Sequence, residues 1–148
     1  MFKTIAIGID GSDASLKALR AACEIAQRFG AELHLVHTPQ PQTVAFALGA
    51  VPGYDVVTTM PSAQEVEEAA QKVVRQGLAV AEEMGQTVSN TYTDRGDPIA
   101  QIIACADSCG ADLIVTGRRG LGNLGALILG STSLGISNRA TCAVLSVP

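Results

Sequence analysis

Two residue patterns alternate along the whole of this 148-residue chain and leave few folds open to it. Short, unbroken apolar runs are typical of strands buried on both faces of a parallel sheet. Between them lie longer segments whose apolar residues recur every three or four positions, as in amphipathic helices. The alternation predicts an α/β fold, a three-layer open parallel sheet covered by helices. We place its five strands at residues 3–9, 32–37, 87–93, 112–116 and 142–147.

Capping signals place four helices between these strands. Ser12 is a natural N-cap for the first helix, and Ser62 begins a capping box for the second. Asp97 followed by proline is typical of a helix start and precedes the third. A shorter fourth helix is expected at residues 131–139. Strands and helices together use the whole chain, so we expect one domain over residues 1–148.

The charge balance excludes several classes of function. Ten Lys and Arg against 14 Asp and Glu give a net charge of −4, and the cationic residues are scattered. Nucleic-acid binders normally carry a basic face, so we expect no nucleic-acid partner. A membrane span needs roughly 20 apolar residues in a row, and the chain has no such run and no signal-peptide layout at its start. We therefore expect a cytoplasmic protein without a membrane partner.

The four cysteines support the same compartment. They lack the CxxC spacing of zinc or thioredoxin-like sites, and they stand among apolar neighbours at Cys23, Cys105, Cys109 and Cys142. We interpret them as small buried hydrophobic residues in a reducing cytoplasm.

Polar residues and glycines gather after the first and fourth strands, where an open α/β sheet binds its ligands. Asp10 supplies a carboxylate that suits a ribose hydroxyl or a cation. The glycines after Thr116 let backbone N–H groups approach an anion, with Arg118 and Arg119 beside them. Residues 130–132 begin a helix whose free N–H groups attract phosphate. Together these features predict a nucleotide site.

Structural interpretations of the same residues remain open. Asp10 can share the capping of the first helix with Ser12. Ser131 and Thr132 can cap the last helix, which uses the N–H groups that a phosphate would need. We expect one of the two arginines to face the phosphates and the other to face solvent.

The spacing Gly117-x2-Gly120-x9-Gly130-Ser131 is similar, position for position, to the G-2x-G-9x-G-S/T nucleotide motif of the universal stress protein family. The resemblance spans the chain, through Asp10 after the first strand, His37 at the end of the second and Gly96-Asp97-Pro98 before the third helix. It implies an adenine nucleotide alpha hydrolase-like fold with sheet order 3-2-1-4-5. It also implies a homodimer joined through the last strand, Cys142 to Val147.

Family members with the full motif typically bind ATP, with Mg²⁺ or Mn²⁺ bridging phosphate oxygens rather than held in a protein metal site. The resemblance implies that Asp10 meets the ribose or triphosphate, that the backbone after the second strand frames the adenine, and that the glycine motif holds the phosphates. The ATP-binding residues expected on this basis are Gly8, Ile9, Asp10, His37, Thr38, Thr116, Gly117, Arg118, Arg119, Gly120, Gly130, Ser131 and Thr132.

No catalytic residue is assigned, because efficient ATP cleavage needs a positioned water or acceptor and no base for it stands near the glycine motif. We interpret His37 as a hydrogen-bonded structural residue rather than a general base. The expected function is a nucleotide-dependent regulatory or stress-response module with slow or no hydrolysis. Two alternatives stay open: a weak ATPase or autophosphorylating enzyme, and a dimeric interaction protein without nucleotide. The long connection at residues 38–61 is expected to be a lid, a mobile segment or a surface for a partner subunit or an unidentified protein partner. A loop packed on its own domain is an equal alternative.

Overall fold

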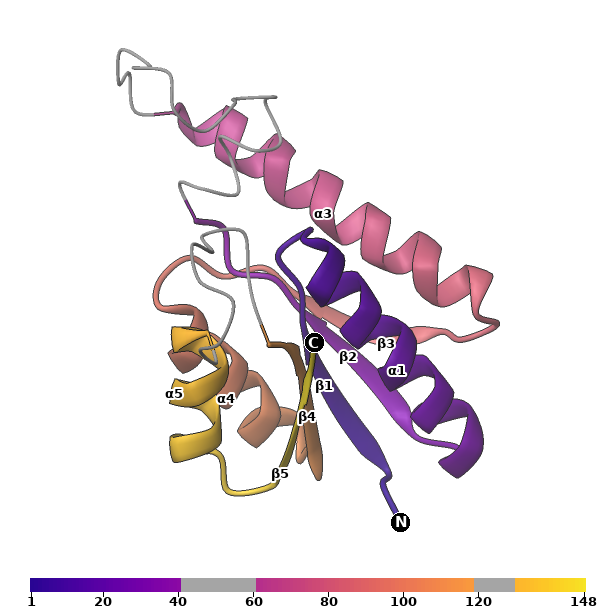
Figure 1. The fold of residues 1–148 in the computed structure, drawn as a ribbon. Coiled ribbons are helices and arrows are strands. Elements are labelled where there is room, and N and C mark those ends of the chain that lie inside the picture. The colour runs from indigo at the N-terminus through magenta and orange to yellow at the C-terminus, as the bar shows by residue number, and fades with distance from the viewer. Residues whose placement is uncertain (41–60, 119–129) are drawn as a thin grey trace.

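A five-stranded parallel sheet forms the centre of the protein, with helices packed on both of its faces (Figure 1). The computed structural model describes residues 1–40, 61–118 and 130–148. The strand order is β3-β2-β1-β4-β5, and every neighbouring pair is parallel. The predicted α/β fold with sheet order 3-2-1-4-5 is therefore confirmed.

The elements lie close to their predicted positions. The strands are β1 (Thr4–Gly8), β2 (Glu32–Val36), β3 (Val88–Tyr92), β4 (Leu113–Gly117) and β5 (Ala143–Val147). The helices of the described residues are α1 (Asp13–Phe29), α3 (Ala63–Glu83), α4 (Pro98–Cys109) and α5 (Ser131–Arg139). Each observed strand boundary lies within one residue of the predicted one, a difference that is usual at element boundaries.

The predicted helix caps are present. Ser12 Oγ accepts a hydrogen bond from the Ser15 backbone N–H at 3.2 Å. Ser62 and Glu65 form a complete capping box at the start of α3. The Asp97 carboxylate accepts from the Ala100 N–H at 3.0 Å at the start of α4. Each side chain satisfies an N–H group that the helix itself leaves unpaired, which explains why these signals were readable from the sequence.

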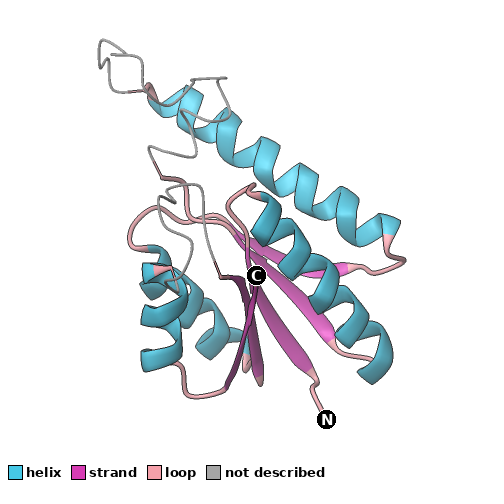
Figure 2. Ribbon diagram, viewed as in Figure 1, coloured by secondary structure: helices cyan, strands magenta, loops and turns pink. Residues whose placement is uncertain are grey.

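Helices α1 and α3 cover one face of the sheet, and α4 and α5 cover the other (Figure 2). Successive side chains of a strand point to opposite faces. Ile5 and Ile7 of β1 therefore belong to the core under α1 and α3, while Ala6 belongs to the core under α4 and α5. Because both faces are covered, the central strands are apolar at most positions on both faces, which is the pattern seen in the sequence.

The strand β3 lies at one edge of the sheet, as its polar sequence predicts. Ser89, Asn90 and Thr91 are all exposed. The Asn90 side chain accepts a hydrogen bond from the Thr91 N–H at 2.9 Å. A polar edge with an occupied N–H group is a poor template for pairing with another strand.

The interpretation of the cysteines needs a correction. Cys23 and Cys105 are buried, but Cys109 and Cys142 are only half-buried. The latter two stand at the last turn of α4 and just before β5, where the core under these elements reaches the surface. Burial raises the pKa of the Cys23 thiol and that of Cys142, and it raises the pKa of Cys105 to about 12.

Two further expectations concern a membrane span and the long connection between β2 and α3. In the described ranges, no helix combines the length and the apolarity that crossing a bilayer requires. The interpretation of the connection at residues 38–61 falls almost wholly on residues 41–60, which lie outside the described residues.

Candidate functional site

The turn from β1 into α1 is held by a small network around Asp10. Its Oδ1 accepts hydrogen bonds from the Ser12 N–H, at 2.9 Å, and from the Ser12 hydroxyl. The Asp10 N–H donates to Ser15 Oγ at 3.3 Å, and that hydroxyl donates to the Ser12 carbonyl at 2.9 Å. The structural role of Asp10 in the helix entry is thus confirmed. Within the described residues nothing donates to its second oxygen, Oδ2, so the carboxylate keeps an acceptor for a ligand.

The carboxyl ends of β1 and β2 are tied together by His37. Its Nδ1 lies 2.9 Å from the Ile9 carbonyl oxygen, which is only an acceptor, so Nδ1 carries the proton and donates. The ring is 1% exposed, and its Nε2 has no hydrogen-bond partner among the described residues. Burial lowers the pKa of His37, against the opposing effects of the Ile9 carbonyl and the nearby Asp10 charge. A neutral, hydrogen-bonded ring at neutral pH agrees with its structural interpretation.

The described ends of the glycine motif meet in space. The Arg118 N–H donates to the Val147 carbonyl at 2.6 Å, which anchors the chain after β4 to the end of β5. The Gly130 N–H donates to the Arg118 carbonyl at 2.9 Å, so the start of α5 is fastened beside the end of β4. Arg119 and Gly120 lie outside the described residues. The prediction that one of the two arginines faces the phosphates therefore stays a prediction.

Gly117 has a packing role that the sequence did not reveal. A Cβ atom at this position would lie 2.9 Å from both Ala14 C and Ser15 N, in the backbone of α1. The end of β4 therefore approaches the first turn of α1 closely enough that a side chain has no space. The same contact brings Gly117 beside Ser15 and so beside the Asp10 turn. The residues predicted after strands one and four do come together.

Within the described residues, no side chain caps the N-terminus of α5. Its N-cap is Gly130, with φ −55 and ψ 148, and no side chain provides a cap hydrogen bond. Ser131 is exposed and Thr132 is half-buried. The alternative in which Ser131 or Thr132 caps this helix is therefore wrong: the two residues occupy its first positions rather than the position before it. The first turn contains no acidic residue, so its N–H groups and positive dipole end are available to an anion.

The remaining predicted residues offer mainly backbone to the site. Ile9, Thr38 and Thr116 are buried, at 4%, 8% and 6% exposure. The Thr116 hydroxyl donates to the Gly117 carbonyl at 3.3 Å. At Gly8, a Cβ would lie 2.7 Å from Ile102 Cδ1, so this glycine serves the packing of α4. These positions can shape the floor of a site but present few side-chain groups to a ligand.

Comparison with known proteins identifies the family. The family model described as "Universal stress protein family" matches residues 1–148. The chain belongs to the universal stress protein family.

Its relatives cover it almost from end to end. A universal stress protein of Thermus aquaticus is 36% identical over 99% of this chain and 99% of its own length. The universal stress protein YxiE of Bacillus subtilis is 33% identical, with the same coverage of both chains. Among solved structures, a universal stress protein crystallised in complex with cAMP superposes with a TM-score of 0.71 at 27% identity, covering 99% of this chain and 97% of the other.

Three site residues of this universal stress protein escaped sequence reasoning. Ser15 supports Asp10, and the buried Ser133 donates from Oγ to the Gly117 carbonyl at 2.8 Å. Gln40 Nε2 donates to the Gly96 carbonyl at 3.0 Å and joins the chain after β2 to the turn before α4. A serine in the first turn of a helix is a weak signal by itself, because most such residues face solvent.

The described part of the chain contains no cluster of three or more His, Cys, Asp or Glu side chains that could hold a metal ion. Asp10 is the one carboxylate among the predicted site residues. This donor set fits a metal that is bound mainly through phosphate oxygens, and it does not fit a protein-only metal site.

Proposed function

We propose that this universal stress protein binds ATP at the carboxyl edge of its sheet and uses it as a regulatory signal in a stress response. The observation that carries the proposal is the start of α5. Its N–H groups lack a side-chain cap, and the Gly130–Arg118 hydrogen bond fastens them beside the end of β4.

The electrostatics of this position favour a polyanion despite the net charge of −4. A helix N-terminus carries roughly half a positive charge, and unpaired N–H groups bind phosphate oxygens directly. The backbone of Arg118 is hydrogen-bonded to Gly130, so this residue brings a positive charge close to the start of α5, and the first turn of α5 has no carboxylate to repel an anion. Mg²⁺ or Mn²⁺, bound to phosphate oxygens, would neutralise further charge. The free carboxylate oxygen of Asp10 is the protein group that could contact this metal ion.

The opposite end of the site suits a nucleoside. Asp10 has one oxygen held by Ser12 and one without a described donor, so it can accept from a ribose hydroxyl while the turn stays intact. His37 and Thr38 follow β2 at the same edge of the sheet, so in this proposal their backbone borders the base. A relative crystallised with cAMP supports an adenine nucleotide as the ligand class.

The first experiment identifies the ligand. Protein purified without added nucleotide is denatured, the released nucleotide is analysed, and calorimetry then compares ATP with Mg²⁺, ADP, cAMP and GTP. We expect ATP to bind most tightly, because cAMP presents a single phosphate to the start of α5. Tighter binding of cAMP would support the assignment of the site but show that ATP is not its preferred ligand. No binding of any nucleotide would refute the proposal.

A variant tests the position of the phosphates. Gly130→Val places a branched side chain at the N-cap of α5, beside the N–H groups that would bind phosphate. Because φ at this position is −55, valine can adopt the backbone conformation without strain. We expect loss of ATP binding with an unchanged melting temperature in the absence of nucleotide. Gly130→Ala, which adds only a methyl group, is the matched control and should bind more weakly without losing binding. Equal ATP affinity of wild type and Gly130→Val would contradict the site assignment.

The rate of ATP hydrolysis distinguishes a regulatory role from a catalytic one. We propose that hydrolysis is slow or absent, so single-turnover cleavage of bound ATP should fall well below about 1 s⁻¹, the low end for ordinary enzymes. Faster turnover, or a phosphate transferred to the protein itself, would favour the enzyme alternatives.

We also propose a homodimer joined through β5, from Cys142 to Val147. This strand is at the sheet edge opposite β3, and its residues from Val144 onward are half-buried although, among the described residues, it pairs with β4 on one side only. Light scattering on the purified protein should give twice the chain mass of 15.2 kDa. A monomer at all concentrations would refute this part of the proposal.

A further inference from the structure

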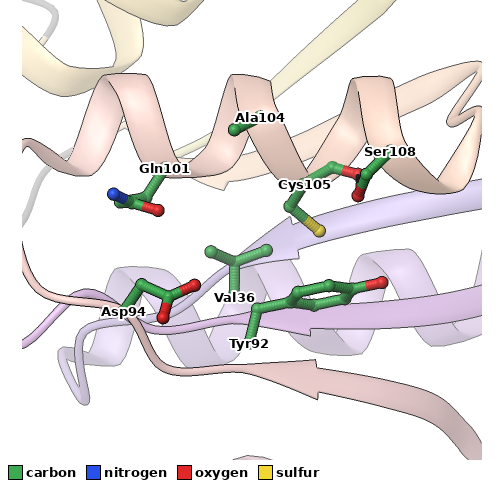
Figure 3. Close-up of a pocket in the computed structure, with 7 residues that line it drawn as sticks. All are labelled: Val36, Tyr92, Asp94, Gln101, Ala104, Cys105 and Ser108. Atoms are coloured by element: carbon green, nitrogen blue, oxygen red, sulfur yellow. Dashed lines mark hydrogen bonds between the residues drawn. The ribbon is translucent and has the colours of Figure 1, made fainter.

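A groove runs along α4 on the face of the sheet opposite to α1 and α3. It has a volume of about 250 Å³ and lies over the edge strand β3 and its neighbour β2. Figure 3 shows Gln101 and Cys105 pointing from α4 toward the strands, with Val36 and Tyr92 below them. The groove is separate from the Asp10 turn and from the start of α5, so the proposed nucleotide site does not account for it.

The walls of the groove are apolar along most of its length. Val36 is 4% exposed, and the Tyr92 ring lies along the floor (Figure 3). Burial raises the pKa of Cys105 to about 12, so this side chain is a neutral thiol that acts as part of the apolar wall. At the far end, the Ser108 hydroxyl already donates to the Cys105 carbonyl at 2.9 Å. An apolar body of a few carbon atoms would therefore replace water here without leaving polar groups unpaired.

The end of the groove nearest the carboxyl edge of the sheet is different, because a carboxylate and a side-chain amide line it. The Asp94 carboxylate and the Gln101 amide face each other there (Figure 3). Gln101 Nε2 donates to the Arg95 carbonyl at 3.3 Å, which leaves Oε1 as its free acceptor. No ion pair within the described residues involves Asp94; the two that are formed join Arg20 to Glu83 and His34 to Glu32.

A carboxylate, an amide oxygen and an aromatic ring within one groove all attract positive charge. An ammonium group beside Asp94 would pair with this carboxylate. The apolar part of the same ligand would then lie over Tyr92 and Val36. We propose that this groove is a binding site for a small organic amine, protonated at neutral pH, whose apolar body lies between α4 and Tyr92. The volume limits the ligand to about the size of a single ring with a short chain.

The test uses two probes of the same shape. Phenylethylamine carries the cation, and phenylethanol replaces it with a neutral hydroxyl. Binding is followed by chemical-shift changes of assigned backbone amides, in the absence of nucleotide. We expect the amine to bind about five- to tenfold more tightly than the alcohol, the effect of one partly exposed ion pair together with a cation–π contact. The largest shifts should come from residues 92–108.

Three variants locate the interaction. Asp94→Asn keeps the shape of the groove and removes its charge, so the preference for the amine should disappear. Ala104→Leu fills the groove from an exposed position of α4, where leucine is a good helix former, and should weaken both probes. Glu24→Gln removes an exposed carboxylate from α1, on the other face of the sheet, and should change neither affinity.

Equal affinities for the two probes, a preference that survives Asp94→Asn, or shifts that map outside the groove would each overturn the proposal. The proposal does not depend on ATP binding, since the probes are tested without nucleotide. Adding ATP afterwards tests coupling between the two sites and leaves the assignment of the groove unchanged.

Discussion

Replacing Gly117 with alanine should destabilise the protein even when no nucleotide is present. The added Cβ would lie 2.9 Å from Ala14 C and Ser15 N and 3.0 Å from Ala14 O. Ordinary van der Waals contact begins at 3.4 Å. All three atoms belong to the backbone of α1, so no rotation of a side chain can relieve the overlap, and either α1 or the end of β4 must move.

The expected loss follows from two opposing contributions. Overpacking of a well-packed interior typically costs about 1–3 kcal/mol. Replacing glycine by alanine also restricts the unfolded chain, which returns about 0.4–1 kcal/mol. The net loss in the free energy of unfolding should therefore be about 1–2 kcal/mol, which lowers the melting temperature of a domain of this size by roughly 2–8 °C.

Gly8→Ala is the matched control, because Gly8 is also the last residue of a central strand. Its Cβ would lie 2.7 Å from Ile102 Cδ1, which is the far end of a flexible side chain. Ile102 can change rotamer, so the loss should be less than about 1 kcal/mol. Urea unfolding of both variants without nucleotide measures the difference. The reasoning is wrong if Gly117→Ala is as stable as the wild type, or if Gly8→Ala is the more damaging change.

Two further predictions concern stability. Because burial lowers the pKa of His37 below 6.5, the unfolded chain takes up a proton first as the pH falls. The stability due to the neutral ring is complete above pH 6.5 and is lost as the pH falls through the lower folded-state pKa, by about 1.4 kcal/mol for each unit of the shift. In His37→Gln this contribution is absent, so urea unfolding between pH 5 and 7.5 should show a shallower pH dependence; an identical slope would contradict it. Glu83→Gln breaks the 2.9 Å ion pair with Arg20, whose side chains are 64% and 44% exposed. Its loss should stay below about 1 kcal/mol and shrink further in high salt, and a larger loss in thermal unfolding would show that the pair is coupled to the packing of α3 on α1.

Local signals in the sequence were sufficient for most of the fold. Apolar runs placed the buried strands, a β-prone but polar segment placed the edge strand β3, and the caps at Ser12, Ser62 and Asp97 placed three helix starts. These features depend on interactions within about one helical turn, or on the two-sided burial of a strand, and so they can be read without knowing the partner elements. The sheet order came from the family resemblance and not from the periodicity.

The candidate site was readable only in part. Asp10 and Gly130 were found because ligands of open α/β sheets bind at the carboxyl edge and because helix starts attract anions. The burial of Cys109 was overestimated, since apolar neighbours in sequence do not show where a core reaches the surface. The role of Ser133, buried beneath the Gly117 carbonyl, had no sequence signal.

By itself, the sequence determined the class of fold and the elements, because these depend on short-range periodicity and capping, and it indicated a candidate nucleotide region through the rule that open α/β sheets bind ligands at their carboxyl edge. Only the tertiary structure decided what the individual residues do there. Gly117 is required by the backbone of α1, the His37 Nδ1–H donates a hydrogen bond to the Ile9 carbonyl, and the Gly130 N–H at the start of α5 donates to the Arg118 carbonyl after β4. Each of these facts depends on a contact between segments that are distant in the chain, and such contacts exist only after the sheet has assembled.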